Sequence, residues 1–580
     1  MTTSGLVEPY SRRVHPWAGV DLERNVEMAN RDGTVLRADI YRPAEPSGPR
    51  PVLLHRTPYG KDFVHDGHYL HPAWYVREGF IVVVQDIRGR FTSDGEFVPY
   101  LHDLLDGYDT VEWAARVDGA NGKVGMYGAS YPGMVQYLAA VEAPPSLGAI
   151  SPTVAAADLH SHWTYEGGAL RLFVPHWTAA LLTEIGLRRD QPELTAAARA
   201  IRSVPSHAGS WLGSAPPIHL EPLEQAEFYR DWLTHVENDE FWRERSAFHR
   251  LDQVECPVLH IGAWFDTFLE GAIAAYGALA ARDNAPEQWL IIGPWGHLPG
   301  GERVGDLITG SEARGTVNLD RVQVEFFRRH LSDADPAPEP NRDRVRYFEM
   351  FANRWRESPA WPPQGTEHTL YLRSGGSANT VGGDGRLATD APTDSEPGDI
   401  YHYIPRMPVG TLGGHTCCDD GALPSGPKDQ HFLERLPEIL VYTSGPMEKD
   451  VSIAGPVRVE LWTGTEAVSA DYVTRLCVVH EGRSVNVSDG IRRMTSADLD
   501  SSRDADGVAR VVVEMQSASA LVRRGDMLRL HVTSGAFPAF DINPQTGAPP
   551  AETSVFDGVA AMHAVMHQPD RPSRLTVYLV

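Results

Sequence analysis

Ser130 stands at the most informative point of the sequence, where a glycine-containing turn joins a predicted strand to a predicted helix. Residues 124–127 form an apolar run, residues 134–140 have helical periodicity, and residues 128–133 between them read Gly-Ala-Ser-Tyr-Pro-Gly. A serine at so sharp a corner is held in a strained conformation, so its neighbours must be small. The usual pattern has glycine at position 132, but Pro132 is compatible with a first helical turn, where its missing N–H has no partner to lose. The pattern predicts a nucleophile elbow.

A serine nucleophile needs a base and a carboxylate that orients the base. In sheets that carry such an elbow, both follow the serine in the chain, each just past the end of a later strand. Two later apolar runs end close to Asp266 and His297, in that order. Taken alone, Asp266 also fits a helix N-cap, and His297 also fits a loop histidine that donates to a backbone carbonyl. The remaining candidates fit the order or the placement less well: His55, Asp86 and His260.

Acyl transfer also needs hydrogen-bond donors aimed at the oxygen that becomes negative in the transition state. One expected donor is the N–H of Tyr131, the residue after the nucleophile. The second must come from a loop that follows an earlier strand, and residues 55–61 form such a loop. That loop offers a backbone N–H or the phenol of Tyr59, although Tyr59 alone also fits a packed surface tyrosine.

Composition places the chain among ordinary globular proteins. Its 580 residues are 42% hydrophobic and 22% charged, which excludes disordered, fibrous and membrane proteins. The formal net charge of −25 disfavours nucleic acid and membrane surfaces as partners. No phosphate-cradling glycine loop or metal-ligand cluster appears in context, so we expect no cofactor and no metal.

The four cysteines show no spacing typical of a zinc site or a disulfide framework. They are Cys256, Cys417, Cys418 and Cys477. The first ten residues lack an apolar targeting segment, and no run of 18 apolar residues occurs. We therefore expect a cytoplasmic protein with unpaired cysteines.

The order of apolar patterns predicts an α/β fold class with three domains. Strand-like runs that alternate with helices predict a parallel sheet from residues 1–145 and again from residues 246–353. Residues 146–245 have helical periodicity and predict an inserted helical unit. After the proline-rich residues 335–340, short alternating runs predict an antiparallel β-sandwich over residues 354–580.

Segments spread along the whole chain share a pattern with one family. They are residues 31–43, 56–59, 85–90, 93–97, 128–133, 262–266, 293–297, 488–492 and 534–538. Together they resemble the cocaine-esterase-like (CocE/NonD) hydrolases of the X-prolyl dipeptidyl peptidase (S15) superfamily. The resemblance implies an α/β-hydrolase domain with an inserted helical cap, followed by a C-terminal jelly-roll β-sandwich.

The resemblance also implies roles for individual residues. Ser130 is the nucleophile with Asp266 and His297 as its partners, and the oxyanion hole consists of the Tyr59 hydroxyl and the Tyr131 N–H. Glycine at 133 is the family's own pattern. In the relatives, aromatic residues from the cap and from just after the acid line the acyl pocket. The matching positions here, with one from the jelly roll, are Trp163, Trp177, Phe268 and Leu412.

Members of this family hydrolyse aryl esters, X-Pro peptides, α-amino-acid esters or β-lactam side-chain amides. The amino-acid ester hydrolases place acidic residues two and three positions after the catalytic aspartate, where this chain has Phe268 and Leu269. An ammonium group would be left unpaired there at a cost of several kcal/mol, unless Glu270 reaches inward.

The leading hypothesis is a serine carboxylesterase for small-molecule esters with an apolar or aromatic acyl group. An X-Pro dipeptidyl aminopeptidase or amide acylase, an acyltransferase to a small acceptor, and a non-catalytic carbohydrate-binding protein are the alternatives. Jelly-roll edges that pair between subunits would give a homodimer, which the sequence leaves open.

Overall fold

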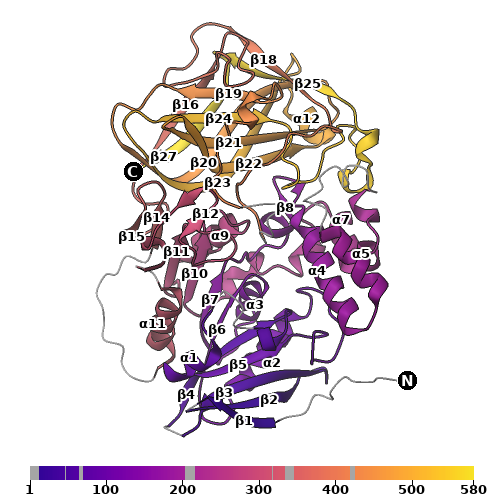
Figure 1. Ribbon diagram of the computed structural model, residues 1–580, viewed down its shortest axis with the longest axis vertical. Coiled ribbons are helices and arrows are strands. Elements are labelled where there is room, and N and C mark those ends of the chain that lie inside the picture. Colours follow the sequence, from indigo (N-terminus) through magenta and orange to yellow (C-terminus); the bar gives the residue numbers. More distant parts are fainter. Residues whose placement is uncertain are drawn as a thin grey trace.

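The first sheet has eleven strands in the order β1-β2-β3-β5-β4-β6-β7-β10-β11-β14-β15 (Figure 1). The computed structural model describes residues 12–17, 19–45, 48–63, 69–202, 216–315, 318–332, 345–417 and 425–580. Neighbours from β5 to β14 are parallel, and the strands at both ends are antiparallel. The strands are β1 (Arg12–Trp17), β2 (Val20–Ala29), β3 (Val35–Pro43), β4 (Arg50–Thr57), β5 (Ile81–Asp86), β6 (Ala120–Ala129), β7 (Leu147–Thr153), β10 (Val258–Ala263), β11 (Gln288–Gly293), β14 (Val345–Glu349) and β15 (Arg354–Ser358).

Helices cover both faces of this sheet, which is why its central strands are apolar throughout. α1 (Pro72–Arg77) and α11 (Leu319–Leu331) pack on one face. The other face carries α2 (Asp103–Ala114), α3 (Tyr131–Ala140) and α9 (Leu269–Ala280). At Gly125 in β6, a Cβ atom would lie 2.7 Å from the Phe327 ring, so glycine is what lets α11 approach the strand.

The cap is the segment between β7 and β10, on the right of Figure 1. Its main helices are α4 (Phe173–Arg188), α5 (Pro192–Arg202), α7 (Glu227–Thr234) and α8 (Glu240–Arg243). A short hairpin of β8 (Tyr165–Glu166) and β9 (Ala169–Leu170) precedes α4. The buried interior of the cap is rich in tryptophan and continues into the core beneath α3.

The C-terminal domain is a twelve-stranded, almost entirely antiparallel sheet system at the top of Figure 1. Its central order is β18-β25-β20-β27-β16-β17-β19-β24-β21-β22, with β23 on β20 and β26 on β25. The strands are β16 (Thr366–Arg373), β17 (Arg386–Ala388), β18 (Glu396–Tyr403), β19 (Leu440–Ser444), β20 (Val451–Thr465), β21 (Ala470–His480), β22 (Arg483–Met494), β23 (Ala509–Val522), β24 (Met527–Thr533), β25 (Ala561–Gln568), β26 (Arg571–Pro572) and β27 (Arg574–Leu579). The predicted α/β fold with a helical insertion and a β-sandwich is confirmed.

The β8–β9 hairpin joins the cap to the β-sandwich. The Arg493 N–H donates to the Gly167 carbonyl at 2.8 Å, and the Leu170 N–H donates to the Asp541 carboxylate at 3.0 Å. Gly167 has φ of +52°, and a Cβ atom there would lie 1.9 Å from the Ile491 carbonyl oxygen. The hairpin therefore lies directly on β22, at a spacing that only glycine permits.

Three local features differ from the sequence prediction. β7 belongs to the central sheet although it lies within residues 146–245, where only helices are expected. The sequence does not predict this strand because its seven residues include Gly, Ser and Pro, which are weak strand formers. β15 extends the first sheet to Ser358, beyond the boundary expected after residue 353. Cys417 is part of a disulfide, so the expectation of four unpaired cysteines is wrong at this residue, whereas Cys256 and Cys477 are free and buried.

The proline-rich residues 335–340 and Cys418 lie outside the described residues. Within the part of the chain that the structure describes, no helix is both long and apolar enough to cross a membrane.

Candidate active site

The carboxyl ends of β6, β7, β10 and β11 meet at one edge of the sheet. Parallel strands bring the residues that follow them to the same edge, so residues far apart in sequence become neighbours. Backbone hydrogen bonds continue across the edge beyond the ladders: Ser130 N to Thr153 O at 3.0 Å, Val154 N to Ile261 O at 2.7 Å, Trp264 N to Gly293 O at 3.0 Å and Phe265 N to Trp295 O at 3.0 Å. They hold the turns that carry Ser130, Asp266 and His297 to one another.

Ser130 lies at the turn between β6 and α3. Its φ of +62° and ψ of −127° are strained for a residue with a Cβ atom, and its carbonyl accepts from the Gly133 N–H at 2.8 Å. A Cβ atom at Gly128 would lie 2.5 Å from Pro132, and one at Gly133 would lie 2.6 Å from Ala155. Both glycines therefore allow the close packing that holds the serine at this corner.

Asp266 and His297 are joined by a buried hydrogen bond. His297 Nδ1 and Asp266 Oδ1 are 2.8 Å apart, and the aspartate side chain has no exposed surface. An Nδ1–H that donates to the carboxylate leaves Nε2 as the proton acceptor of the neutral ring. The Phe268 ring packs edge-on against the imidazole, with the ring centroids 5.4 Å apart.

Tyr59 contacts the hydroxyl of Ser130. The Ser130 hydroxyl interacts with the phenol, and the Trp177 indole N–H donates to the Tyr59 oxygen at 3.1 Å. The surrounding apolar side chains raise the pKa of Tyr59, so the phenol keeps its proton. Because Trp177 occupies an acceptor position of the phenol, the Tyr59 proton is available for donation. Between the described residues, no hydrogen bond joins Ser130 to His297.

Tyr131 is held both by its ring face and by its hydroxyl group. It stacks on Tyr100 with the centroids 4.1 Å apart, and its hydroxyl donates to Asp103 at 2.7 Å. Asp103 in turn pairs with Arg56 at 3.2 Å. Tyr131 is the first residue of α3, where backbone N–H groups have no acceptor within the helix, so its N–H can serve a ligand near Ser130.

An aromatic cluster lies above these residues. Three of the four predicted pocket residues belong to it: Trp163 contacts Trp177 at 5.2 Å and stacks on Phe268 at 6.3 Å between centroids. Through Phe268 the cluster reaches His297, and through Trp177 it reaches Tyr59. Sequence reasoning missed further members, because core and pocket aromatics have the same helical periodicity: Tyr100, Phe173, Phe228 and Trp232.

Leu412 lies apart from the other predicted pocket residues. It packs against a small β-sandwich cluster that contains Val409 and Leu433, and its carbonyl accepts from Gln430 at 2.8 Å. Its role as a pocket residue stays a prediction.

Glu270 turns away from the site. Its carboxylate accepts from the Ser517 N–H of β23 at 2.5 Å, and burial raises its pKa. The two positions that carry acids in amino-acid ester hydrolases are held by Phe268 and Leu269, both buried. No carboxylate from this turn is therefore left to pair with a substrate ammonium group.

A buried cluster of charges lies behind Asp266, between the cap and the β-sandwich. Glu166 pairs with Arg171 at 2.7 Å and with His415 at 2.8 Å, and His415 also pairs with Asp489. Although burial alone would lower the pKa of His415, the carboxylates of Asp489 and Glu166 raise it to about 10. Burial likewise opposes the charge of Glu166, but His415 and Arg171 lower its pKa to about 2.

One group of described residues has the atoms of a metal site: Glu434, Cys477 and His531, whose ligand atoms lie within 4.8 Å of one another. Glu434 is already paired with Arg529 at 2.5 Å and with His531 at 2.9 Å. Burial raises the pKa of Cys477 to about 12, so its thiol is protonated. A guanidinium beside the carboxylate and a neutral thiol do not fit a metal ion, and the group is a buried ion pair.

A strained serine at the strand-to-helix turn, with an aspartate–histidine pair at later strand ends, defines an α/β hydrolase. The profile of the X-Pro dipeptidyl-peptidase (S15 family) matches residues 32–299, and that of the X-Pro dipeptidyl-peptidase C-terminal non-catalytic domain matches residues 341–576. A cocaine esterase from Rhodococcus sp. (strain MB1 Bresler) is 32% identical over 96% of this chain and 98% of its own length. The chain belongs to the CocE/NonD hydrolases of the S15 family.

Solved structures share the whole architecture. An α-amino acid ester hydrolase has a TM-score of 0.79 at 23% identity and covers 100% of both chains. A CocE/NonD family hydrolase from Staphylococcus aureus has a TM-score of 0.67 at 19% identity, covering 97% of this chain and 94% of its own. At these identities the likeness extends to the fold alone.

We expect the charge on His415 to make stability depend on alkaline pH. Because the pKa of His415 is higher in the folded protein than its ordinary value of 6.5, protonation of His415 stabilises the fold. This contribution is fully present below pH 6.5 and is lost as the pH rises towards about 10. The thermal midpoint of the wild type should fall by several degrees between pH 7 and pH 10. The thermal midpoint of His415→Gln should be lower at pH 7 and should fall less over the same range.

His563→Gln is the matched control, because burial lowers the pKa of His563 to about 4 and the ring is neutral across the same range. The thermal midpoint of this variant should fall as steeply with pH as that of the wild type. Equal slopes for the wild type and His415→Gln would show that His415 is not charged in the folded protein.

Proposed function

We propose that this hydrolase is a serine carboxylesterase that forms an acyl-enzyme on Ser130. The observation that carries the proposal is the buried His297–Asp266 hydrogen bond at the strand ends beside the strained Ser130. Similarity to a cocaine esterase over nearly the whole chain favours ester chemistry.

Each residue has a role in this reaction. The Ser130 hydroxyl turns from Tyr59 to His297 as the substrate carbonyl approaches, because hydrogen bonds of a free site often rearrange in the substrate complex. His297 Nε2 accepts the serine proton, and Asp266 stabilises the imidazolium. The Tyr59 hydroxyl and the Tyr131 N–H donate to the oxyanion, His297 returns the proton to the leaving alcohol, and a water activated by His297 then releases the acid.

The aromatic cluster supports an apolar or aromatic acyl group. Trp163, Trp177 and Phe268 offer ring faces and edges but no charge, and rings prefer such stacked and edge-on contacts. Because Glu270 is bonded to Ser517, an acyl group with a free α-amino group would lose its hydration without gaining an ion pair. This arrangement disfavours amino-acid esters and X-Pro peptides with a free N-terminus.

Ser130→Ala should lower kcat for p-nitrophenyl esters by about a thousandfold or more, because the nucleophile is lost. The wild type should cleave p-nitrophenyl benzoate and branched acyl esters with higher kcat/KM than p-nitrophenyl esters of free amino acids, an X-Pro anilide or a β-lactam side-chain amide. Ser501→Ala, an exposed serine on the β-sandwich, is the control and should retain full activity.

Retained turnover in Ser130→Ala would contradict the proposal. A higher kcat/KM for the X-Pro anilide than for every ester would replace it with a peptidase. Transfer of the acyl group to an added alcohol in preference to water would indicate an acyltransferase.

Tyr59→Phe should lower kcat by about 100- to 1000-fold with little change in KM, because it removes one oxyanion donor and keeps the ring. Trp177→Phe keeps Tyr59 but removes the indole N–H that orients it, so a smaller loss of kcat is expected. Steady-state kinetics with p-nitrophenyl benzoate measure both variants, and an unchanged kcat in Tyr59→Phe would remove the phenol from the oxyanion hole.

A further inference from the structure

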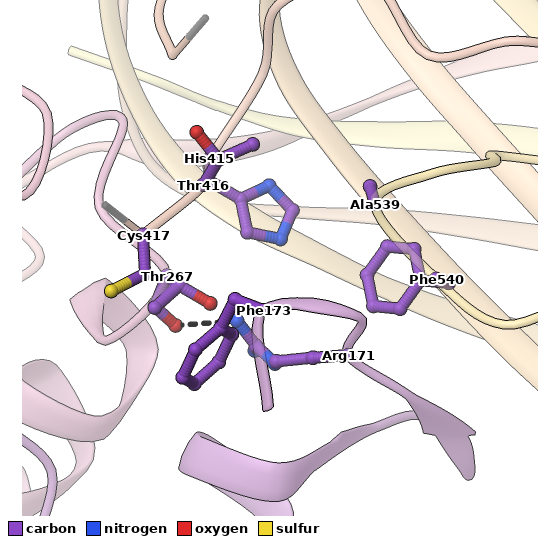
Figure 2. A pocket seen from close by; sticks show the side chains of 8 residues that line it. All are labelled: Arg171, Phe173, Thr267, His415, Thr416, Cys417, Ala539 and Phe540. Carbon is purple, nitrogen blue, oxygen red and sulfur yellow. Dashed lines mark hydrogen bonds between the residues drawn. The ribbon is translucent and has the colours of Figure 1, made fainter. Parts of the chain in front are cut away.

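Arg171 lies buried where all three regions of the protein meet (Figure 2). It follows β9 in the cap hairpin, and its Nη1 donates to the Thr267 carbonyl at 2.7 Å. Its Nη2 pairs with Glu166 at 2.7 Å. The dashed line in Figure 2 marks the contact with Thr267, the residue that directly follows Asp266.

The β-sandwich holds the other side of Arg171. Figure 2 shows His415 above the guanidinium and Phe540 beside it. His415 reaches Arg171 through Glu166, to which it bonds at 2.8 Å, and Asp489 pairs with the second ring nitrogen of His415. The lining of the small cavity here also includes Phe173, Thr416, Cys417 and Ala539. With a volume of about 20 Å³, it has room for one water and not for part of a substrate.

The backbone before and after Asp266 is therefore held from outside the hydrolase domain. Before it, the Phe265 carbonyl accepts from the Thr416 N–H at 3.2 Å, and Asp266 itself forms a β-bridge with Thr416. After it, the Thr267 carbonyl accepts from Arg171. The two contacts flank Asp266 and restrain the backbone from which its side chain extends.

The Asp266 carboxylate also needs compensating charge. Oδ1 bonds His297, whereas the buried Oδ2 has no hydrogen-bond partner among the described residues. Arg171 interacts electrostatically with this carboxylate, although burial, the larger effect, lowers the pKa of the guanidinium. A buried anion with one hydrogen bond is costly, and a nearby fixed cation offsets that cost.

We propose that Arg171 is a positioning residue for Asp266, held in place by Glu166, His415 and Asp489. The guanidinium restrains the peptide that joins Thr267 to Phe268 and places a positive charge near the Asp266 carboxylate. Through this arrangement the cap and the β-sandwich set the orientation of His297. The inference rests on the proposed role of Asp266 in the serine mechanism.

Arg493 offers a matched control. It is another buried arginine between the same hairpin and the β-sandwich, paired with Asp471 at 2.7 Å and with Asp541 at 2.9 Å. Asp541 accepts from Leu170 of the hairpin at 3.0 Å. Arg493 thus supports the same interface, but none of its described hydrogen bonds or ion pairs reaches residues 265–267.

The test compares Arg171→Lys and Arg171→Met with Arg493→Lys, each in the full-length protein with its thermal midpoint measured. Arg171→Met should lower kcat for p-nitrophenyl benzoate by about 10- to 100-fold with KM changed less than about twofold, since a misplaced catalytic group costs this much. Arg171→Lys keeps the charge and one donor, so it should recover part of the loss. Arg493→Lys should lose stability but retain kcat.

The ring N–H signal of His297, observed by NMR with isotope-labelled histidine and assigned by its loss in His297→Ala, gives a readout that does not depend on turnover. It should shift in Arg171→Met and stay in place in Arg493→Lys. An unchanged signal in Arg171→Met, or an equal loss of kcat in the two lysine variants, would overturn the role of Arg171. A wild type without esterase activity whose His297 signal still responds to Arg171 would reject the proposed function and retain this inference.

Discussion

The buried carboxylate of Asp266 is the constraint on which the rest of the site depends. An ionised carboxylate removed from water is stable only if hydrogen bonds and opposite charge replace its hydration. Here one oxygen bonds His297 at 2.8 Å, and the guanidinium of Arg171 provides the nearby positive charge. Because Arg171 is held in turn by Glu166 and His415, the compensation requires the cap and the β-sandwich together with the central sheet. The β-sandwich is therefore part of the structure that holds the turn carrying Asp266.

Neighbouring side chains give the remaining groups their chemical character. Tyr59 keeps its proton because apolar neighbours raise its pKa, and Trp177 leaves that proton free to be donated. Tyr131 is clamped by Tyr100 and Asp103, which fixes the start of α3 and with it the backbone N–H next to Ser130. Fixed donors in a site that excludes water stabilise developing charge far better than donors that must reorient. The aromatic cluster contacts His297 through Phe268 and Tyr59 through Trp177.

The parts of the site that follow strands were predictable from the sequence. The glycine pattern around Ser130 and the order of Asp266 and His297 depend on local geometry that leaves a local signal, and so does the alternation of strands and helices in the first domain. β7 left too weak a signal, because Gly, Ser and Pro interrupt its apolar residues. Helical periodicity does not distinguish aromatic residues of a pocket from those of the core, so it does not identify Phe173 and Trp232 as pocket candidates.

Contacts between residues far apart in the chain leave no pattern in the sequence. The contacts Glu166–His415 and Arg171–Thr267 join residues about 250 and 100 positions apart, and only the folded structure brings them together. Glu270 looked able to reach the site, but the β-sandwich backbone at Ser517 turns it away. Pairing of charges across domains follows from packing, which composition and spacing do not encode.

In the proposed mechanism, residues from three strand ends form one activated nucleophile. Labelling the full-length protein with a fluorophosphonate, followed by mass spectrometry of its peptides, tests this directly. We expect a single phosphonylated peptide that contains Ser130, with labelling strongly slowed in His297→Ala. A label on another serine, or equally fast labelling of Ser130 without His297, would contradict it.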